Sequence, residues 1–400
     1  MSLAPRSESP RVLVWNQYFP PDTSATASLL AQLVDRFEVQ GVGTHVVQGN
    51  PSYRPTRTFK WKPWELWRRG QDGTVVHSAA RSRARLIDRA LNYLTYTALS
   101  FLVALRTRCD VILVMTDPPI AVVPAVLVGK LRRKRVVYWL QDYHPEFMVG
   151  IGRIRPWPLV RVWSWAHRWA LRRCDLVIAI GRDMRDRLET AGVRSDHIEV
   201  VANGSSVDWS SEAASRTRVS GADKLVVLHA GEIGMRGAWE ALVAGARDAA
   251  DVASLVLLGD GVDADWVREL TAGSDAVTIE PRLPWLEYTR RLLDADVLIT
   301  MVRRGAEGYS VPSKTYELFG CARPIIVIAD PSSEPARLVT ELDCGFVVSP
   351  DDGHEFAAAL RALAADPGLR ERLGANALKA KDAFRRDDQL DRVVALVTNS

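Results

Sequence analysis

The segment Val311 to Pro324 (VPSKTYELFGCARP) places a hydroxyl, a cation and a carboxylate near the expected start of one helix. Proline and serine are favoured at helix starts, so we expect Ser313 to stand at the entrance. Free backbone N–H groups there, together with the charge of Lys314, suit the phosphates of a diphosphate. Glu317 follows three positions later, and a carboxylate can accept hydrogen bonds from two adjacent hydroxyls, such as those of a ribose.

Each of these side chains also has a structural alternative. Ser313 and Glu317 could cap the helix, although their spacing is one residue longer than that of a capping box. Lys314 could be an ordinary solvated lysine at the surface. The residues alone leave both interpretations open.

Two turns of the C-terminal half could also approach a ligand. The turn AGEIGMRG contains Gly234 and the cation Arg236, which could equally be a surface arginine. Gly259 begins the turn GDG after an expected buried strand, where a tight turn is needed for structural reasons alone. We therefore predict mainly a structural role for Gly259.

In the N-terminal half, polar residues follow expected strands and precede expected helices. Gln141 and Asp142 end one strand, and Asp142 could orient the hydroxyl of an acceptor. His144 lies nearby, although a lone loop histidine is more often inert. One residue of the run Asp22 to Ser24 could simply cap the next helix. The candidate residues on this side are Tyr18, Asp22, Thr23, Ser24, Gln141 and His144.

Apolar runs of strand length alternate with helical periodicity along both halves of the chain. We expect N-terminal strands at 12–15, 44–48, 75–76, 111–115, 135–140, 176–180 and 198–201, with helices at 25–40, 86–106, 121–131 and 158–173. We expect C-terminal strands at 224–228, 254–258, 276–280, 297–300, 324–329 and 345–348. The predicted fold class is α/β, with two Rossmann-like β/α/β domains, at 1–204 and 224–385, that face each other across a cleft. A linker is expected at 205–223. A C-terminal helix is expected at 386–400 and could pack back on the first domain.

Several segments in the same order resemble one known family. They are WNQYFPPDTSAT, NYLTYTALS, TDPP, YWLQDYHPE, HAGEIGMRG, LLGDG, VPSKTYELFGCARPII and GFVVSPDD. Together they are similar to glycosyltransferase family 4, the retaining enzymes with the GT-B fold, and most of all to its branch of bacterial O-antigen, capsule and colanic acid transferases. The resemblance covers residues 11–390.

The resemblance implies a role for each matching residue. Glu317 matches the second glutamate of the family's E-x7-E motif, which holds the donor ribose, whereas the first would fall on Tyr309, two residues after Glu307. Arg236 matches the lysine of the family's diphosphate loop, whose arginine position holds Glu232. The implied donor-binding residues are Gly234, Arg236, Gly259, Arg282, Glu307, Ser310, Val311, Pro312, Ser313, Lys314 and Glu317. The implied catalytic residues are Asp142, Arg236 and Lys314.

The implied reaction is retaining transfer of a hexosyl or N-acetylhexosaminyl group. The donor would be a nucleotide-diphosphate-sugar, and we expect it to be UDP-linked. The acceptor would be a lipid-linked molecule or a small molecule. The product would belong to the synthesis of cell-surface polysaccharide, of a glycoconjugate or of a natural product. No metal is expected, because the seven histidines are scattered and no D-x-D stands at a strand end. Arg236 and Lys314 would instead stabilise the departing diphosphate. The alternatives are a nucleotide-sugar-binding protein that has lost catalysis, which Tyr309 and Glu232 favour, and a GT-B epimerase.

Positive charge and tryptophan are concentrated in the N-terminal half. Residues 51–173 contain 23 Lys and Arg against 7 Asp and Glu, although the whole chain carries only +4. Trp61, Trp64 and Trp67 are spaced by three, and four more tryptophans lie among the arginines of 155–173. This combination is typical of a membrane interface, so we predict peripheral contact with an anionic membrane. Each observation also has an alternative explanation without a membrane. The tryptophans could pack against the sheet, and the positive charge could reflect a general bias of the sequence towards arginine. Nucleic acid is not expected, because no reader module is recognisable.

The remaining features predict a cytoplasmic location. The four cysteines lie far apart with no CxxC pair, which argues against a zinc site and a disulfide framework. The first ten residues lack the apolar stretch of a signal peptide, and the longest apolar stretches are too short or too interrupted to span a bilayer. We therefore expect the cytoplasm, with possible attachment to the inner face of the membrane as a peripheral protein.

Overall fold

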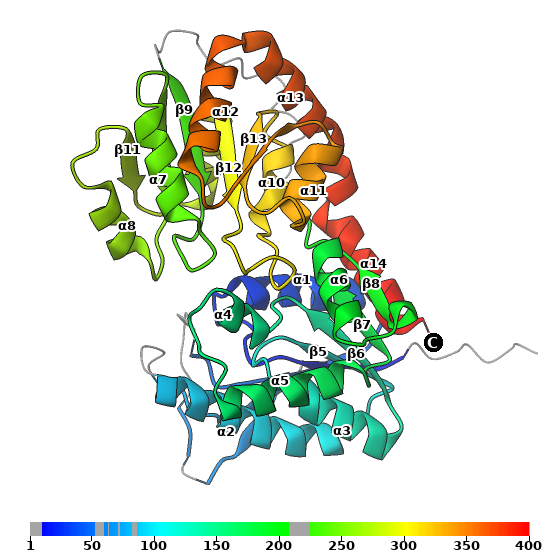
Figure 1. Ribbon diagram of the computed structural model, residues 1–400. Coiled ribbons are helices and arrows are strands. Elements are labelled where there is room, and N and C mark those ends of the chain that lie inside the picture. Colours follow the sequence, from blue (N-terminus) through cyan, green and yellow to red (C-terminus); the bar gives the residue numbers. More distant parts are fainter. Residues whose placement is uncertain are drawn as a thin grey trace, which may run out of the picture.

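Two α/β domains, each built on one sheet, form the protein (Figure 1). The computed structural model describes residues 10–52, 60–62, 64–70, 73–81, 86–207 and 224–399. The predicted fold class is confirmed. Residues 208–223, which make up most of the expected linker, lie outside the described residues.

In the described part of the chain, the N-terminal sheet has eight strands, of which only the edge strand β3 runs antiparallel to its neighbour. Side chains of β1 alternate between two apolar clusters: Val12 and Val14 face one, and Leu13 and Trp15 face the other. Both faces are therefore buried, as expected for parallel strands covered by helices. In spatial order the strands are β3 (Trp67–Arg69), β4 (Gly73–Val76), β2 (Thr44–Gln48), β1 (Val12–Trp15), β5 (Val111–Met115), β6 (Arg135–Leu140), β7 (Leu176–Ala179) and β8 (Ile198–Val200).

Helices cover both faces of this sheet. The N-terminal helices are α1 (Ala25–Val39), α2 (Leu86–Arg106), α3 (Val122–Arg132), α4 (Glu146–Gly150), α5 (Pro158–Leu171) and α6 (Arg182–Thr190). α2, α3 and α5 pack side by side on the face furthest from the other domain, and α1 packs on the opposite face, next to the cleft (Figure 1). The short elements β3 and α4 were not predicted from the sequence.

The C-terminal sheet has six parallel strands, and the predicted strands match them to within a few residues. In spatial order they are β11 (Val277–Glu280), β10 (Ala253–Leu258), β9 (Leu225–Ala230), β12 (Val297–Met301), β13 (Ile325–Ile328) and β14 (Gly345–Val348). The helices are α7 (Trp239–Asp248), α8 (Ala264–Thr271), α9 (Trp285–Asp294), α10 (Lys314–Phe319), α11 (Glu334–Glu341), α12 (Gly353–Ala365) and α13 (Pro367–Ala380).

The last helix, α14 (Arg386–Thr398), returns to the N-terminal domain. Its residues Leu390, Val393, Val394 and Val397 are buried in the same apolar cluster as α1. The chain therefore crosses between the domains twice. Both crossings meet at one place, where the Ser205 N–H donates to the Phe384 carbonyl at 2.7 Å and the Arg386 N–H donates to the Ser205 carbonyl at 2.9 Å.

A second set of contacts joins the domains through α6. Asp183 accepts hydrogen bonds from the N–H groups of Glu334, at 3.0 Å, and Gly308, at 3.1 Å. Arg337 of α11 forms an ion pair with Asp186 at 2.7 Å. The relative position of the domains is thus fixed at the crossing point and along α6.

The face formed by α2, α3 and α5 exposes many large apolar side chains. They are Ile87, Leu91, Leu94 and Leu102 on α2, Leu127 and Leu131 on α3, and Leu159, Val162 and Trp165 on α5. Leu159 is 82% exposed and Trp165 61% exposed. Other tryptophans are half-buried: Trp61 stacks on His77, and Trp169 lies against the core. Internal packing, one of the two alternatives for the tryptophans, therefore holds for Trp169 but not for the exposed Trp165.

Candidate active site

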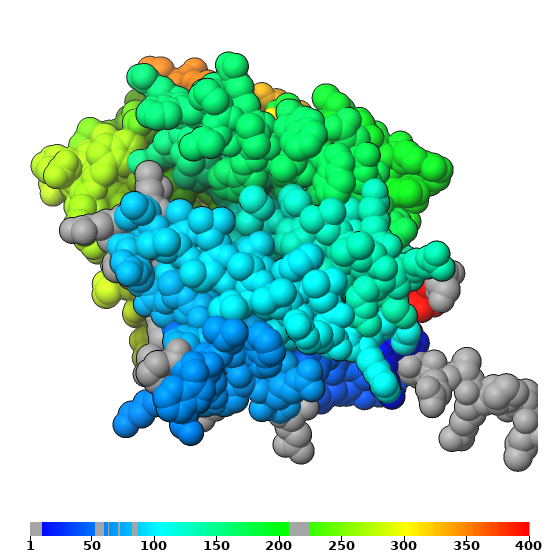
Figure 2. Space-filling model, turned by 90° about the horizontal axis from the view of Figure 1, so that it is seen from below, coloured from blue at the N-terminus to red at the C-terminus, as the bar shows by residue number. Residues whose placement is uncertain are grey.

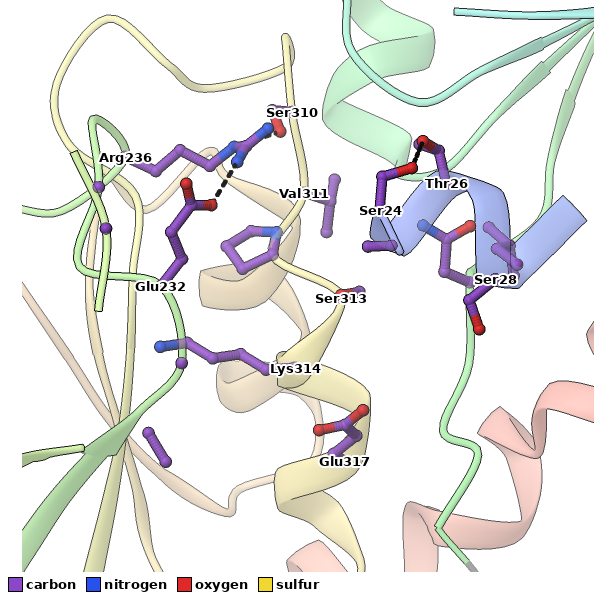
Figure 3. A pocket seen from close by; sticks show the side chains of 18 of the residues that line it. Ser24, Thr26, Ser28, Glu232, Arg236, Ser310, Val311, Ser313, Lys314 and Glu317 are labelled. Atoms are coloured by element: carbon purple, nitrogen blue, oxygen red, sulfur yellow. Dashed lines mark hydrogen bonds and ion pairs between the residues drawn. The ribbon is translucent and has the colours of Figure 1, made fainter. Parts of the chain in front are cut away.

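A cavity of about 890 Å³ lies between the domains, at the carboxyl ends of the two central sheets. The N-terminal domain contributes the start of α1 and the end of β6. The C-terminal domain contributes the end of β9, the turn after it, and the segment 310–317. Figure 3 shows Arg236, Lys314 and Glu317 along the C-terminal wall, with Ser24 and Ser28 opposite them on α1.

The VPSK segment forms part of this wall. Ser310, Val311, Pro312 and Ser313 all line the cavity. The Ser313 side chain makes no capping hydrogen bond, so the predicted capping alternative is wrong. α10 is only six residues long and sums few peptide dipoles, so side chains must supply most of the positive charge.

Lys314 points into the cavity beside a buried histidine. Its Nζ lies 3.0 Å from Nδ1 of His229, the residue near the end of β9 that is only 2% exposed. Burial lowers the pKa of His229 well below its ordinary value, so this imidazole is neutral. Burial also lowers the pKa of Lys314 to about 7, against the opposing attraction of Glu317 and Glu232. Lys314 is therefore not an ordinary surface lysine.

Arg236 lies at the boundary between the domains. Its Nη2 donates to Oδ1 of Asp142 at 2.7 Å, and its Nε donates to Oγ of Ser310 at 2.8 Å. The carboxylate of Glu232 lies 3.7 Å from Nη1. Burial alone would raise the pKa of Asp142, but the charges of Arg236 and His144, together with hydrogen bonds to Ser310 and Arg236, lower it overall. The pair is therefore ionised.

Glu317 lines the same wall, one helical turn beyond Lys314. Its Oε2 accepts a hydrogen bond from the hydroxyl of Tyr288 at 3.1 Å. Burial raises the pKa of Glu317, while the charges of Arg386 and Lys314 oppose that rise. Arg386 also lines the cavity and donates to the carbonyls of Asn203 and Gly204, at 3.0 and 2.9 Å.

Three of these wall residues were not predicted: His229, Tyr288 and Arg386. His229 belongs to the HAGE turn, so that turn carried a signal for it. Arg386 reaches the cavity only because α14 crosses back to the N-terminal domain, which no local pattern encodes. The predicted residues Arg282, Gly234, Thr23, Ser24 and Gln141 line the cavity.

Two predicted donor-binding residues do not line the cavity. Glu307 is buried, and its Oε2 accepts from the Gly305 N–H at 2.8 Å, so its side chain is tied into its own loop. Gly259 packs against backbone: a Cβ there would come within 1.8 Å of the Gly231 carbonyl oxygen. Gly259 is therefore structural, and Glu307 does not replace the glutamate missing at Tyr309.

Three predicted acceptor-side residues are also away from the cavity wall. Tyr18 and Asp22 are buried, and Asp22 Oδ1 accepts from the Ser52 N–H at 2.9 Å. His144 lies behind Asp142 with its ring against Phe147, 5.5 Å between centroids. Ser24 both lines the cavity and caps α1, since its Oγ accepts from the Ala27 N–H at 3.1 Å. Capping, the structural alternative for this run, is thus confirmed for Ser24.

Two further properties concern the described residues only. Within them, no three His, Cys, Asp or Glu side chains come together in a group that could hold a metal ion. None of their helices combines the length and apolar character that crossing a bilayer requires.

Comparison with known proteins identifies the class to which this fold and cavity belong. Residues 26–209 match the family model described as Glycosyltransferase Family 4, and residues 225–366 match the one described as Glycosyl transferases group 1. The two matches correspond to the two domains. The chain belongs to glycosyltransferase family 4, with the GT-B fold, and is a glycosyltransferase.

Individual relatives agree with this assignment. The chain is 24% identical to WbjE of Pseudomonas aeruginosa, named as a glycosyltransferase, over 68% of this chain and 70% of that protein. It is 21% identical to WcaI of Escherichia coli, named for colanic acid biosynthesis, over 88% and 91%. The fold is similar to that of Anabaena HepE in complex with UDP-glucose, with a TM-score of 0.66 at 14% identity over 97% and 99% of the two chains.

Proposed function

We propose that the protein transfers a hexosyl or N-acetylhexosaminyl group, with retention, from a UDP-sugar to a lipid-linked acceptor of cell-surface polysaccharide synthesis. The observation that carries this proposal is the alignment of Arg236, Lys314 and Glu317 along one wall of the cavity (Figure 3). Two cations suit a diphosphate, and the carboxylate beyond them suits the two hydroxyls of a ribose. HepE, whose fold is similar, was crystallised with UDP-glucose.

The cavity has a natural second side for the acceptor. Thr23, Ser24 and Gln141 offer hydroxyl and amide groups, and Asp142 offers a carboxylate at the same edge. During transfer, negative charge builds up on the leaving diphosphate, where Arg236 and Lys314 would stabilise it without a resident metal. In this proposal the leaving phosphate accepts the proton of the acceptor hydroxyl on the face from which the sugar departs.

We further propose that α2, α3 and α5 rest on the cytoplasmic face of an anionic membrane. Figure 2 looks directly at this surface, where their side chains form a broad face. Together the three helices carry six Lys and Arg but a single acidic residue, Asp88. An apolar stripe with basic side chains beside it suits the headgroup region of anionic lipids. The four free, buried cysteines are compatible with a reducing compartment.

Transfer is tested with the purified protein, UDP-sugars and a lipid extract as acceptor. Donor-dependent labelling of lipid by UDP-glucose, UDP-galactose or UDP-N-acetylglucosamine is expected. Glu317→Gln should abolish it without unfolding the protein, whereas Glu307→Gln should retain most activity because Glu307 does not reach the cavity. Absence of both transfer and donor hydrolysis, together with retained UDP binding, would favour a binding protein without catalysis.

Membrane docking is tested by co-sedimentation with phosphatidylcholine vesicles, with and without phosphatidylglycerol. Binding should need the anionic lipid and weaken with salt. Leu159→Asp combined with Trp165→Asp should abolish it. Trp266→Ser, on α8 of the other domain, is the matched control and should bind like the parent protein. Vesicle binding that survives the double substitution would refute this surface assignment.

A further inference from the structure

Arg236 makes contacts that bridge the two domains. It belongs to the turn after β9, yet its shortest ion pair is with Asp142 of the N-terminal domain, at 2.7 Å. The guanidinium carbon also lies 5.3 Å from the ring centre of Phe147 in α4. A carboxylate and an aromatic face are two groups that hold a guanidinium well. The N-terminal domain therefore presents a formed binding place for this cation.

Backbone contacts hold the two partners in register. Asp142 and Ser310 form an antiparallel β-bridge between the domains, and the Tyr143 N–H donates to the Tyr309 carbonyl at 2.8 Å. Ser310 Oγ accepts from Nε of Arg236. The ion pair is thus fixed by its surroundings and is not a loose surface contact.

The same guanidinium is one of the two cations along the donor wall. Both Arg236 and Asp142 line the cavity, with side chains that are 36% and 25% exposed. Glu232 is a second carboxylate near Arg236, at 3.7 Å. Carboxylates therefore surround the cation that a diphosphate needs, so an incoming diphosphate must compete with Asp142 for the same N–H donors.

We propose that Asp142 is a positioning residue that holds Arg236 before the donor binds and gives it up to the donor diphosphate. This inference rests on the proposed function. When the diphosphate takes Arg236, the carboxylate of Asp142 loses its cation at the acceptor side of the cavity. It then becomes available to accept a hydrogen bond from the acceptor hydroxyl. The exchange places donor binding before productive acceptor binding.

The test compares UDP binding by isothermal titration calorimetry for the parent protein and Asp142→Asn, at one pH and salt concentration. The substitution removes the competing anion, so UDP should bind about two- to fivefold tighter, the range of a partly exposed ion pair. Sugar transfer should fall at the same time, because the neutral amide oxygen of asparagine accepts a weaker hydrogen bond from the acceptor hydroxyl than a carboxylate does. A purely structural role for Asp142 would lower both quantities together.

A double-mutant cycle shows whether the increase in UDP affinity caused by Asp142→Asn acts through Arg236. In the Arg236→Gln background, Asp142→Asn should no longer tighten UDP binding. An equal gain in both backgrounds would mean that Asp142 repels the phosphates directly, and would overturn the exchange. Asp186→Asn is the matched control, since it breaks an interdomain ion pair with Arg337 that lies outside the cavity, and it should leave UDP affinity unchanged.

The failures of the two proposals are distinguishable. If the parent protein binds neither UDP nor UDP-sugars, both the proposed function and the exchange are wrong. If it binds UDP but Asp142→Asn binds UDP no more tightly, the exchange alone is wrong and the donor assignment stands.

Discussion

Donor binding should weaken as pH rises through neutrality, because Lys314 of the free protein loses its proton over this range. Burial beside the neutral ring of His229 holds the pKa of Lys314 at about 7. A bound diphosphate would raise this pKa, since a nearby anion favours the ammonium form. The carboxylates that face Lys314 are Glu317 on its own helix and Glu232 on the turn after β9, and both already act to raise the pKa. Binding of donor is therefore coupled to uptake of a proton.

The size of the effect follows from the fraction of Lys314 that is protonated. With a pKa of about 7, roughly ten in eleven lysines carry the proton at pH 6 and roughly one in eleven at pH 8. Apparent affinity scales with the fraction of protein that is competent to bind. Affinity for the donor should thus fall about tenfold between pH 6 and pH 8, equivalent to about 1.4 kcal/mol.

The assay is calorimetric titration with UDP-glucose, whose diphosphate is esterified at both ends and does not itself titrate in this range. Titrations in buffers of different ionisation enthalpy should reveal uptake of about half a proton at pH 7. Lys314→Arg keeps its charge at all these pH values, so its affinity should be nearly independent of pH. A parent protein with flat affinity from pH 6 to 8, or a Lys314→Arg variant that retains the tenfold fall, would refute the reasoning.

Three other substitutions test the site and the fold. Glu232→Arg supplies a cation where the family loop has one, and should tighten UDP binding about threefold or more, measured by calorimetry. Gly259→Ala should lower the free energy of unfolding by about 2 kcal/mol or more in urea titrations, because its Cβ meets the Gly231 carbonyl oxygen and φ is 152°. Gly273→Ala, with φ of 73° and open space around it, is its control and should cost only about 1 kcal/mol. Leu390→Ala should cost about 2–4 kcal/mol and lower the melting temperature, because it opens a void beneath α14.

The sheets and the donor wall were largely predictable because their signals are local. Buried parallel strands such as β5 and β6 appear as short apolar runs whose bounds the sequence predicts correctly. Lys314 and Glu317 lie on adjacent turns of one helix, so their common wall follows from spacing alone. The predicted site roles failed where tertiary packing decides which way a loop side chain points. Asp22 and Glu307 are polar loop residues, yet the carboxylate of each is buried and accepts a hydrogen bond from a backbone N–H group.

The groups contributed from a distance could not be found in the same way. Arg386 reaches the cavity through the second interdomain crossing, and the Asp142–Arg236 pair joins residues 94 positions apart. Periodicity shows which face of a helix is buried but not which distant element covers it. His229 was partly predictable from the sequence. It lies near the end of a strand, where ligand-binding residues often occur, but a single histidine there has no distinctive spacing.

The return of α14 also sets an order for biosynthesis. The sheet face beneath α1 is completed by Leu390, Val393, Val394 and Val397, which are synthesised only after the whole C-terminal domain. While the ribosome is still building the C-terminal domain, the N-terminal domain lacks this cover and leaves apolar surface open to solvent. A nascent chain stalled before α14 should therefore be captured by chaperones or cut by proteases at the first domain, and only synthesis of α14 should cover this apolar surface.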